Sequence, residues 1–150
     1  MKFKKILVLG VLLFLLAACQ KGGNAQAPAV SKPDAGKATV TGRILSLKTG
    51  KPLANMGMRL AEVVRQGGQG AYVLDTAGSP GAYTDDNGYF VFKNITPEDY
   101  VMVVGDVMNT YVIVPDQSGK PRVWNAPIDQ VTQYGDIHVD LAPPASAPEK

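Results

Sequence analysis

The sequence from Thr84 to Val104 reads TDDNGYFVFKNITPEDYVMVV and predicts a turn followed by two β-strands. Its large apolar residues recur at every second position, so they share one face of an extended chain. They are Phe90 and Phe92 in the first run, and Tyr100, Met102 and Val104 in the second. The Asp86-Asn87-Gly88 triplet in front of them tolerates the positive φ angles of a tight hairpin.

The same patterning extends over most of the chain. Short runs of Val, Ile, Tyr, Phe and Thr recur between clusters of Gly, Pro, Asn and Asp, and no segment keeps a helical apolar period. The clearest run comes last, where Ile137, Val139 and Leu141 alternate with polar residues. The predicted strands are residues 38–47, 56–64, 71–75, 89–93, 100–104, 111–114 and 137–141, with an optional one at 122–124. We therefore predict an all-β fold, a seven-stranded antiparallel β-sandwich over residues 38–142.

Three motifs within this region resemble the carboxypeptidase regulatory-like domain family. They are Val40-Thr-Gly42-Arg-Ile44, Thr49-Gly50-Lys-Pro52-Leu53-Ala54, and the stretch that starts at Thr84-Asp85 and ends at Pro97-Glu-Asp-Tyr100. The resemblance covers residues 38–141 and implies a prealbumin-like sandwich. Residues 64–81 depart from it, because they are longer and richer in Gly than the family pattern. Collagen-adhesin B-type and other transthyretin-like domains share the pattern and stay open as alternatives.

The first 18 residues predict a lipoprotein signal peptide. A basic start, MKFKK, leads into an apolar run and then into small residues before Cys19, which is the order of a secretory leader. As a helix, residues 6–18 would cover roughly 20 Å, short of the ~30 Å hydrocarbon core. Leu16-Ala17-Ala18-Cys19 resembles the lipobox of bacterial lipoproteins. The resemblance implies cleavage between Ala18 and Cys19 and a diacylglycerol on the Cys19 thiol; an ordinary secretory leader or a marginal membrane anchor is the alternative.

The two ends of the mature chain have compositions that do not build a core. Residues 19–37 are rich in Gly, Ala, Pro, Asn and Gln and predict a flexible tether behind the lipidated N-terminus. Residues 143–150 are rich in Pro and Ala and predict a disordered tail. Gln20 stands where an Asp would favour inner-membrane retention in the lipoproteins that this chain resembles. We therefore expect a lipid-anchored cell-envelope protein, in the outer membrane if the cell is Gram-negative.

The charge of the chain argues against a nucleic-acid partner, and its cysteine content argues against disulfides and cysteine-based metal sites. The 150-residue chain has a formal net charge of +2. Without Lys2, Lys4 and Lys5 of the leader, twelve basic residues remain against 13 acidic ones, and the basic residues are scattered along the chain. We therefore predict no nucleic-acid partner. One cysteine allows neither an intrachain disulfide nor a cysteine-based metal cluster.

Few groups in the sequence suit catalysis. The single histidine, His138, lies between Asp136 and Asp140, but side chains two apart on a strand diverge by roughly 6–7 Å. We interpret them as a solvated strand face rather than a metal site. Asp85-Asp86-Asn87 offers oxygen ligands for Ca²⁺ without the spacing of a calcium loop, so we interpret it as a hairpin turn. The usual hydrolase, zinc-peptidase and NTPase motifs are missing, and we predict no metal, no cofactor and no enzyme activity.

Four aromatic residues are the candidate ligand-binding groups: Tyr72, Tyr83, Tyr111 and Trp124. Aromatic faces stack on sugars or peptides and bury area at low entropy cost, although a core uses them as well. The Gly-rich segment 65–81 is predicted to be a mobile connection. Two functions follow. The first is a non-catalytic structural or protein-interaction module, and the alternative is a lipoprotein that binds carbohydrate or another small ligand with loops at one end of the sandwich. The expected partners are the membrane, through the N-terminal lipid, and an envelope protein or glycan.

Overall fold

The computed structural model describes residues 27–141, and within that range the chain forms nine β-strands and no helix. The strands are β1 (Ala38–Ser46), β2 (Gly57–Gln66), β3 (Gln69–Val73), β4 (Gly81–Tyr83), β5 (Tyr89–Ile95), β6 (Asp99–Gly105), β7 (Tyr111–Ile113), β8 (Val123–Asn125) and β9 (Val131–Val139). The predicted all-β class is confirmed.

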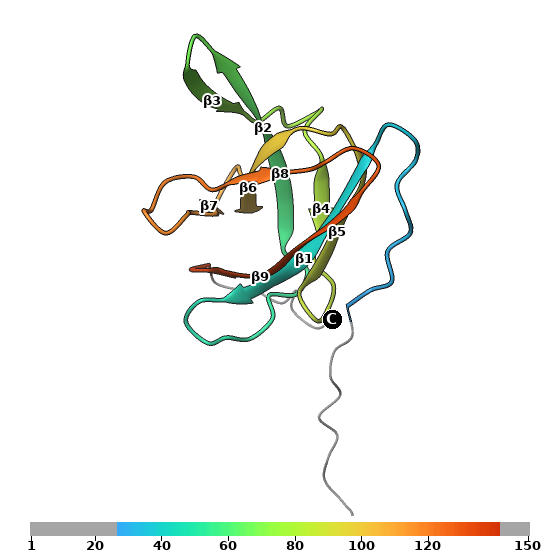
Figure 1. The fold of residues 1–150 in the computed structure, drawn as a ribbon. Helices are drawn as coiled ribbons and strands as arrows, with labels where there is room; N and C mark the ends of the chain where they lie inside the picture. The colour runs from blue at the N-terminus through green and yellow to red at the C-terminus, as the bar shows by residue number, and fades with distance from the viewer. Residues whose placement is uncertain (1–26, 142–150) are drawn as a thin grey trace, which may run out of the picture.

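The described strands form two sheets that face each other as a sandwich (Figure 1). The smaller sheet has the order β5-β1-β9. In the larger sheet β2 and β6 are central, β3 and β4 both pair with the outer side of β2, and β7 and β8 both pair with the outer side of β6. Side chains from both sheets meet in one core, where Ile44 and Phe90 of the smaller sheet and Leu60 and Met102 of the larger are at most 1% exposed.

The number and the direction of the strands differ from the prediction. The described residues contain nine strands instead of seven: the optional strand exists as β8, and β4 was not predicted because three residues are too short to show an alternation. The sandwich is also not wholly antiparallel, since β9 pairs with β1 in parallel. The chain crosses from β8 in the larger sheet to β9 in the smaller one, and that crossover lets β9 run in the same direction as β1.

The Gly-rich segment is not a simple connection. β2 continues to Gln66, and residues 66–69 turn directly into β3 with Gln66 opposite Gln69. Gly67 and Gly68 have φ angles of 59° and 81°, which is the conformation that a two-residue hairpin turn requires at both central positions. The prediction of a mobile connection over 65–81 is therefore wrong for its first part, because paired glycines make a hairpin there.

A close contact between strands explains Gly42 in the first resembling motif. A Cβ at position 42 would lie 2.8 Å from Cζ of Phe90 and 2.9 Å from the carbonyl oxygen of Gly135. Phe90 packs edge-on against Phe92, with ring centroids 5.6 Å apart. Gly42 thus lets the central strand β1 approach both the aromatic core and the bulge of β9, where Gly135 has a φ of 73°.

The turn in front of β5 is held by short side chains. The Asp85 carboxylate accepts backbone N–H bonds from Asn87 at 2.9 Å and from Tyr89 at 2.8 Å. Buried Thr84 accepts a bond from the Met56 N–H at 2.8 Å and donates its hydroxyl hydrogen to the Leu53 carbonyl. Asp85 therefore has the turn-forming role expected of it, and the two residues connect the loop before β2 to the hairpin before β5.

The end of the predicted tether binds the sandwich. The Asp34 N–H donates to the Asn94 side chain at 2.9 Å, and the Gly36 N–H donates to Asp129 at 2.7 Å. No helix in residues 27–141 is long and apolar enough to span a membrane. The signal peptide, Cys19 and the C-terminal tail lie outside the described residues.

Candidate functional site

Cross-strand register brings two of the candidate tyrosines onto one face of the larger sheet. Tyr83 pairs with Gly57 across β4 and β2, and Tyr111 pairs with Gly105 across β7 and β6. The β2–β6 ladder, in which Met58 pairs with Val104, continues to Gly57 and Gly105. Directly opposed residues share a face, so a row of tyrosine, glycine, glycine and tyrosine crosses the sheet. Because Met58 and Val104 point into the core, this row lies on the outer face.

An open groove of about 890 Å³ lies over the glycine pair. The groove is lined by the segment that starts β2, by β4 and by the turn that follows β6: residues 55–59, Thr76, residues 81–83 and residues 105–108. A volume in this range suits a small organic ligand or a short segment of a polymer.

Tyr83 forms one side of the groove. A Cβ at position 57 would lie 3.5 Å from Cε1 of Tyr83, so the tyrosine ring packs against the bare backbone of Gly57. The Tyr83 side chain is nevertheless 77% exposed. An aromatic ring held by the backbone on one side and open to solvent on the other is ready to stack on a ligand.

Met108 forms the opposite rim at the tip of the β6–β7 turn. The Asp106 carboxylate accepts the Met108 N–H at 2.9 Å, and the Asp106 N–H donates to the Thr110 carbonyl at 2.9 Å. Gly105 starts the turn with a φ of 109°, and a Cβ there would overlap the Thr110 carbonyl oxygen, so only glycine fits. The turn holds Met108 at 87% exposure.

Arg59 supplies charge at the floor of the groove. One guanidinium nitrogen donates to the Ser79 carbonyl at 3.2 Å, and the group lies over Gly81, where a Cβ would be 3.7 Å from Nη1. A guanidinium has five N–H donors in a fixed plane, so this one bond orients it without using its full donor capacity. The groove therefore combines an aromatic face, an apolar rim and an oriented cation.

Of the four candidate aromatics only Tyr83 lines the groove; Tyr111 shares its face of the sheet but lies outside the lining, and the other two lie elsewhere. Tyr72 lies on β3 opposite Val63 and is 44% exposed, about six β2 residues, or roughly 20 Å, from Gly57. Trp124 is only 4% exposed and lies in the core, where its ring packs on Tyr134 with centroids 4.5 Å apart. Trp124 thus fills the sandwich instead of facing solvent.

The groove also contains residues that sequence reasoning missed: Gly57, Arg59, Gly105 and Met108. Gly105-Asp106 at the end of an apolar run is a turn signal that could have located the rim. Nothing local marks Gly57 or Arg59, because their place in the groove depends on which strands pair with β2.

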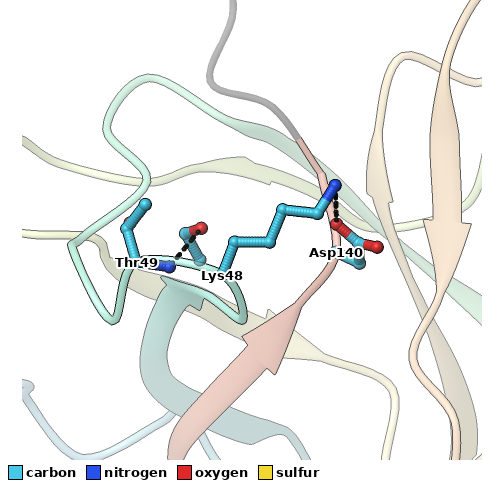
Figure 2. Close-up of polar contacts among 4 residues, drawn as sticks. Lys48, Thr49 and Asp140 are labelled. Carbon is cyan, nitrogen blue, oxygen red and sulfur yellow. Dashed lines mark hydrogen bonds and ion pairs between the residues drawn. The ribbon is translucent and has the colours of Figure 1, made fainter.

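Asp136, His138 and Asp140 are all exposed to solvent at the end of β9 and just after it. His138 is exposed on β9, and Figure 2 shows the Lys48 ammonium directed at Asp140, with Nζ and Oδ1 2.9 Å apart. Both side chains of that ion pair are mostly exposed, so it adds under about 1 kcal/mol to stability. No three His, Cys, Asp or Glu side chains within residues 27–141 are grouped to hold a metal ion.

Asp99 and Tyr100, whose pKa values are shifted, lie at the base of the β2–β3 hairpin, away from the groove. Burial, aided by the nearby Glu98 and Glu62 carboxylates, raises the pKa of Tyr100 to about 12. Hydrogen bonds from Asn125 and Arg65 lower the pKa of Asp99. The Arg65–Asp99 ion pair, at 2.7 Å, ties the hairpin to β6.

No family model matches the chain, and no curated protein is similar to it at a significant level. Among solved structures it is similar to a 9R-lipoxygenase from Cyanothece, with a TM-score of 0.43 and 20% identity over 81% of this chain. The chain spans only 19% of that lipoxygenase. A dioxygenase domain from a cellulolytic Streptomyces gives a TM-score of 0.43 and 14% identity over 83% of this chain and 97% of that one. A candidate carbohydrate-binding protein from Pseudomonas aeruginosa gives 0.41 and 13% over 76% of this chain and 100% of that one.

Two of these similar chains come from enzymes, which contradicts the prediction that this chain is not an enzyme. That prediction rested on missing motifs, and a β-sandwich is a scaffold found in enzymes and binding proteins alike. We therefore withdraw it. At these identities and TM-scores the similarities transfer no substrate, ligand or site residue to this chain.

Proposed function

We propose that this protein is a lipid-anchored binding module of the cell envelope, and that the groove between Tyr83 and Met108 is its ligand site. One observation carries the proposal: an exposed tyrosine ring packs on a glycine floor beside an oriented arginine. Burying large apolar side chains is the usual outcome of folding, so two exposed ones on opposite rims of one groove point to a ligand.

A glycan fits this chemistry best. A pyranose ring has an apolar face that can stack on Tyr83, and its hydroxyl groups are acceptors for the Arg59 guanidinium. Tyr111 lies three strand spacings from Tyr83 along the same row, about 14 Å. Two aromatic platforms at that separation would contact different sugar units of one chain, so an oligosaccharide should bind more tightly than a single sugar.

The anchor would place this groove near a membrane surface. A protein stays attached to a membrane stably only through two or more acyl chains. The lipobox resemblance implies a diacylglycerol on the Cys19 thiol, which meets this requirement. Because Pro33 is buried and the Asp34 N–H binds Asn94, the segment between Cys19 and Pro33 can extend at most about 50 Å. Gln20 favours the outer membrane if the cell is Gram-negative. The resemblance to carboxypeptidase regulatory-like domains fits a sandwich that presents such a site.

Calorimetric titration with a panel of soluble oligosaccharides tests the groove. The wild-type protein should bind at least one member, and Tyr83→Ala should weaken that binding at least about tenfold, which corresponds to ~1.4 kcal/mol. Gly57→Val should also abolish binding, because Gly57 has ordinary strand geometry and a branched side chain there would fill the floor.

Tyr72→Ala is the control, since it removes a partly exposed tyrosine, 44% exposed against 77% for Tyr83, from the same sheet outside the groove. Binding that Tyr83→Ala leaves intact, or that Tyr72→Ala weakens as much, would contradict the proposed site. A panel in which no sugar binds would leave the protein-interaction function as the better proposal.

The protein-interaction module is favoured by a separate observation, the exposed β2–β3 hairpin. All five residues of β3 are exposed, and Val73 is 52% exposed. Crosslinking of the intact chain in cell envelopes, followed by mass spectrometry, would identify a partner at this hairpin.

A further inference from the structure

The β2–β3 hairpin projects from the body of the sandwich as a two-stranded ribbon (Figure 1). Beyond Glu62 its residues are mostly exposed on both faces, including Val64 at 44% and Tyr72 at 44%. An isolated two-stranded ribbon is marginally stable in water. A further strand paired with this ribbon would therefore stabilise it and cover its exposed apolar side chains.

The outer edge of β3 carries none of the features that protect a sheet edge. No described strand pairs with the side of β3 that faces away from β2. The strand reads Gln-Gly-Ala-Tyr-Val, without a charge or a proline, and its five pairs with β2 follow one unbroken register. Edge strands of monomeric proteins are usually short, charged, bulged or covered, so this edge is open to pairing.

The register also shows which backbone groups are open. Gln66 and Gln69 close a two-residue turn, so the polar groups of Gln69 face β2. Polar groups alternate sides along an antiparallel strand. The N–H and C=O groups of Gly70 and Tyr72 consequently point outward, one residue on each side of Ala71.

We propose that a second copy of this chain occupies the edge, with the two β3 strands antiparallel about a two-fold axis at Ala71. Gly70 then pairs with the partner's Tyr72, and Tyr72 pairs with the partner's Gly70. Each pair exchanges two backbone hydrogen bonds, so the four open donors and acceptors of one strand meet those of the other. Each tyrosine ring covers the bare backbone of a glycine on the same face.

The strand is self-complementary in charge as well as in shape. Two rows of opposed residues that run across the dimer contact contain a charge. In one row Arg65 lies in line with the partner's Tyr72 and Val63, and in the other Glu62 lies in line with the partner's Gln69 and Gln66. No like charges are therefore opposed in this register. The contact is isologous, so it closes after two copies and leaves neither β3 edge open to a third. This inference goes beyond the proposed glycan site and does not depend on it.

Sedimentation velocity of the purified full chain, in density-matched detergent across the micromolar range, tests the proposal. The wild type should form a concentration-dependent dimer. Ala71→Lys and Ala71→Glu should each weaken dimerisation at least about fivefold, since each places two like charges directly opposite each other at the axis. An equimolar mixture of the two variants should restore the dimer, because the opposed charges now attract.

Gln66→Lys is the control, since it adds the same charge to the hairpin on β2, one strand away from the new contact. It should dimerise like the wild type. A wild type that is monomeric throughout the range, a dimer that Ala71→Lys leaves unchanged, or a mixture that stays monomeric would overturn the proposal. A larger assembly that persists in Ala71→Lys would indicate contact through another surface and would overturn it as well.

Discussion

Replacing Trp124 with alanine should destabilise the fold strongly, although this residue was a candidate for ligand binding. The indole is 4% exposed, stacks on Tyr134 across the sandwich, and has the Arg122 guanidinium 3.8 Å from its ring centroid. The ring therefore joins β8 of one sheet to β9 of the other, where no ladder connects them.

The magnitude follows from the cavity that alanine would leave. Truncation of a buried tryptophan to alanine costs about 3–5 kcal/mol, and loss of the stacking contact with Tyr134 adds about 1 kcal/mol. One term opposes these: Nε1 of Trp124 is buried without a hydrogen-bond partner among the described residues, and its removal regains about 1 kcal/mol or more. The net cost remains about 3–5 kcal/mol, a large share of the roughly 5–15 kcal/mol of a typical domain.

Thermal unfolding followed by circular dichroism measures this cost. At about 4 °C per kcal/mol for a domain of this size, Trp124→Ala should lower Tm by roughly 12–20 °C. Trp124→Phe should lower it by much less, because phenylalanine keeps the stack and removes the unpaired N–H. Tyr83→Ala, at an exposed position, is the control and should leave Tm nearly unchanged. A Tm for Trp124→Ala close to that of the wild type would refute the placement of Trp124 in the core.

Three further predictions concern other parts of the chain. Mass spectrometry of the mature protein should find a lipidated N-terminus at Cys19, and Cys19→Ser should abolish lipid labelling; an unmodified start elsewhere would exclude the lipoprotein. Gly42→Ala should lower the free energy of unfolding by about 2 kcal/mol or more in a denaturant titration, because its Cβ would lie 2.8 Å from the Phe90 ring, whereas Gly57→Ala should be tolerated. Because folding raises the pKa of Tyr100 from 10.0 to about 12, its contribution to stability is complete below pH 10 and is lost as pH rises toward 12; burial also raises the pKa of Tyr134, so Tyr100→Phe should reduce the alkaline loss in a pH series of unfolding measurements without abolishing it.

Alternation predicts a strand well where it is unbroken and poorly where a bulge interrupts it. Ile137 and Val139 were placed correctly on a buried face of the last strand. The strand begins earlier, at Val131, and the sequence did not show this because Gly135 adopts a φ of 73° and shifts the alternation by one residue. Tyr134 therefore packs inward on Trp124, although a strict two-residue period from Ile137 would place it outward.

The candidate site shows a different limit. Aromatic residues could be singled out, but which of them face solvent depends on the pairing of distant strands. Trp124 is opposite Tyr100, whose side chain points into the core, whereas Tyr111 is opposite Gly105, which occupies a position on the outer face. A single residue of register decides between core and surface, and three-residue strands such as β7 and β8 contain too little pattern to reveal it.

The proposed dimer edge and the proposed ligand groove lie at opposite ends of β2, and this arrangement lets self-association strengthen ligand binding. The groove lies at the start of that strand and the hairpin at its end, so neither obstructs the other. Pairing two β3 strands continues the larger sheet, and directly opposed residues share a face, so both grooves open on the same side. A two-fold pair should therefore bind a glycan polymer with a gain in avidity that Ala71→Lys removes, while a short oligosaccharide binds both forms equally. Equal affinity of wild type and Ala71→Lys for the polymer would show that the grooves do not act together.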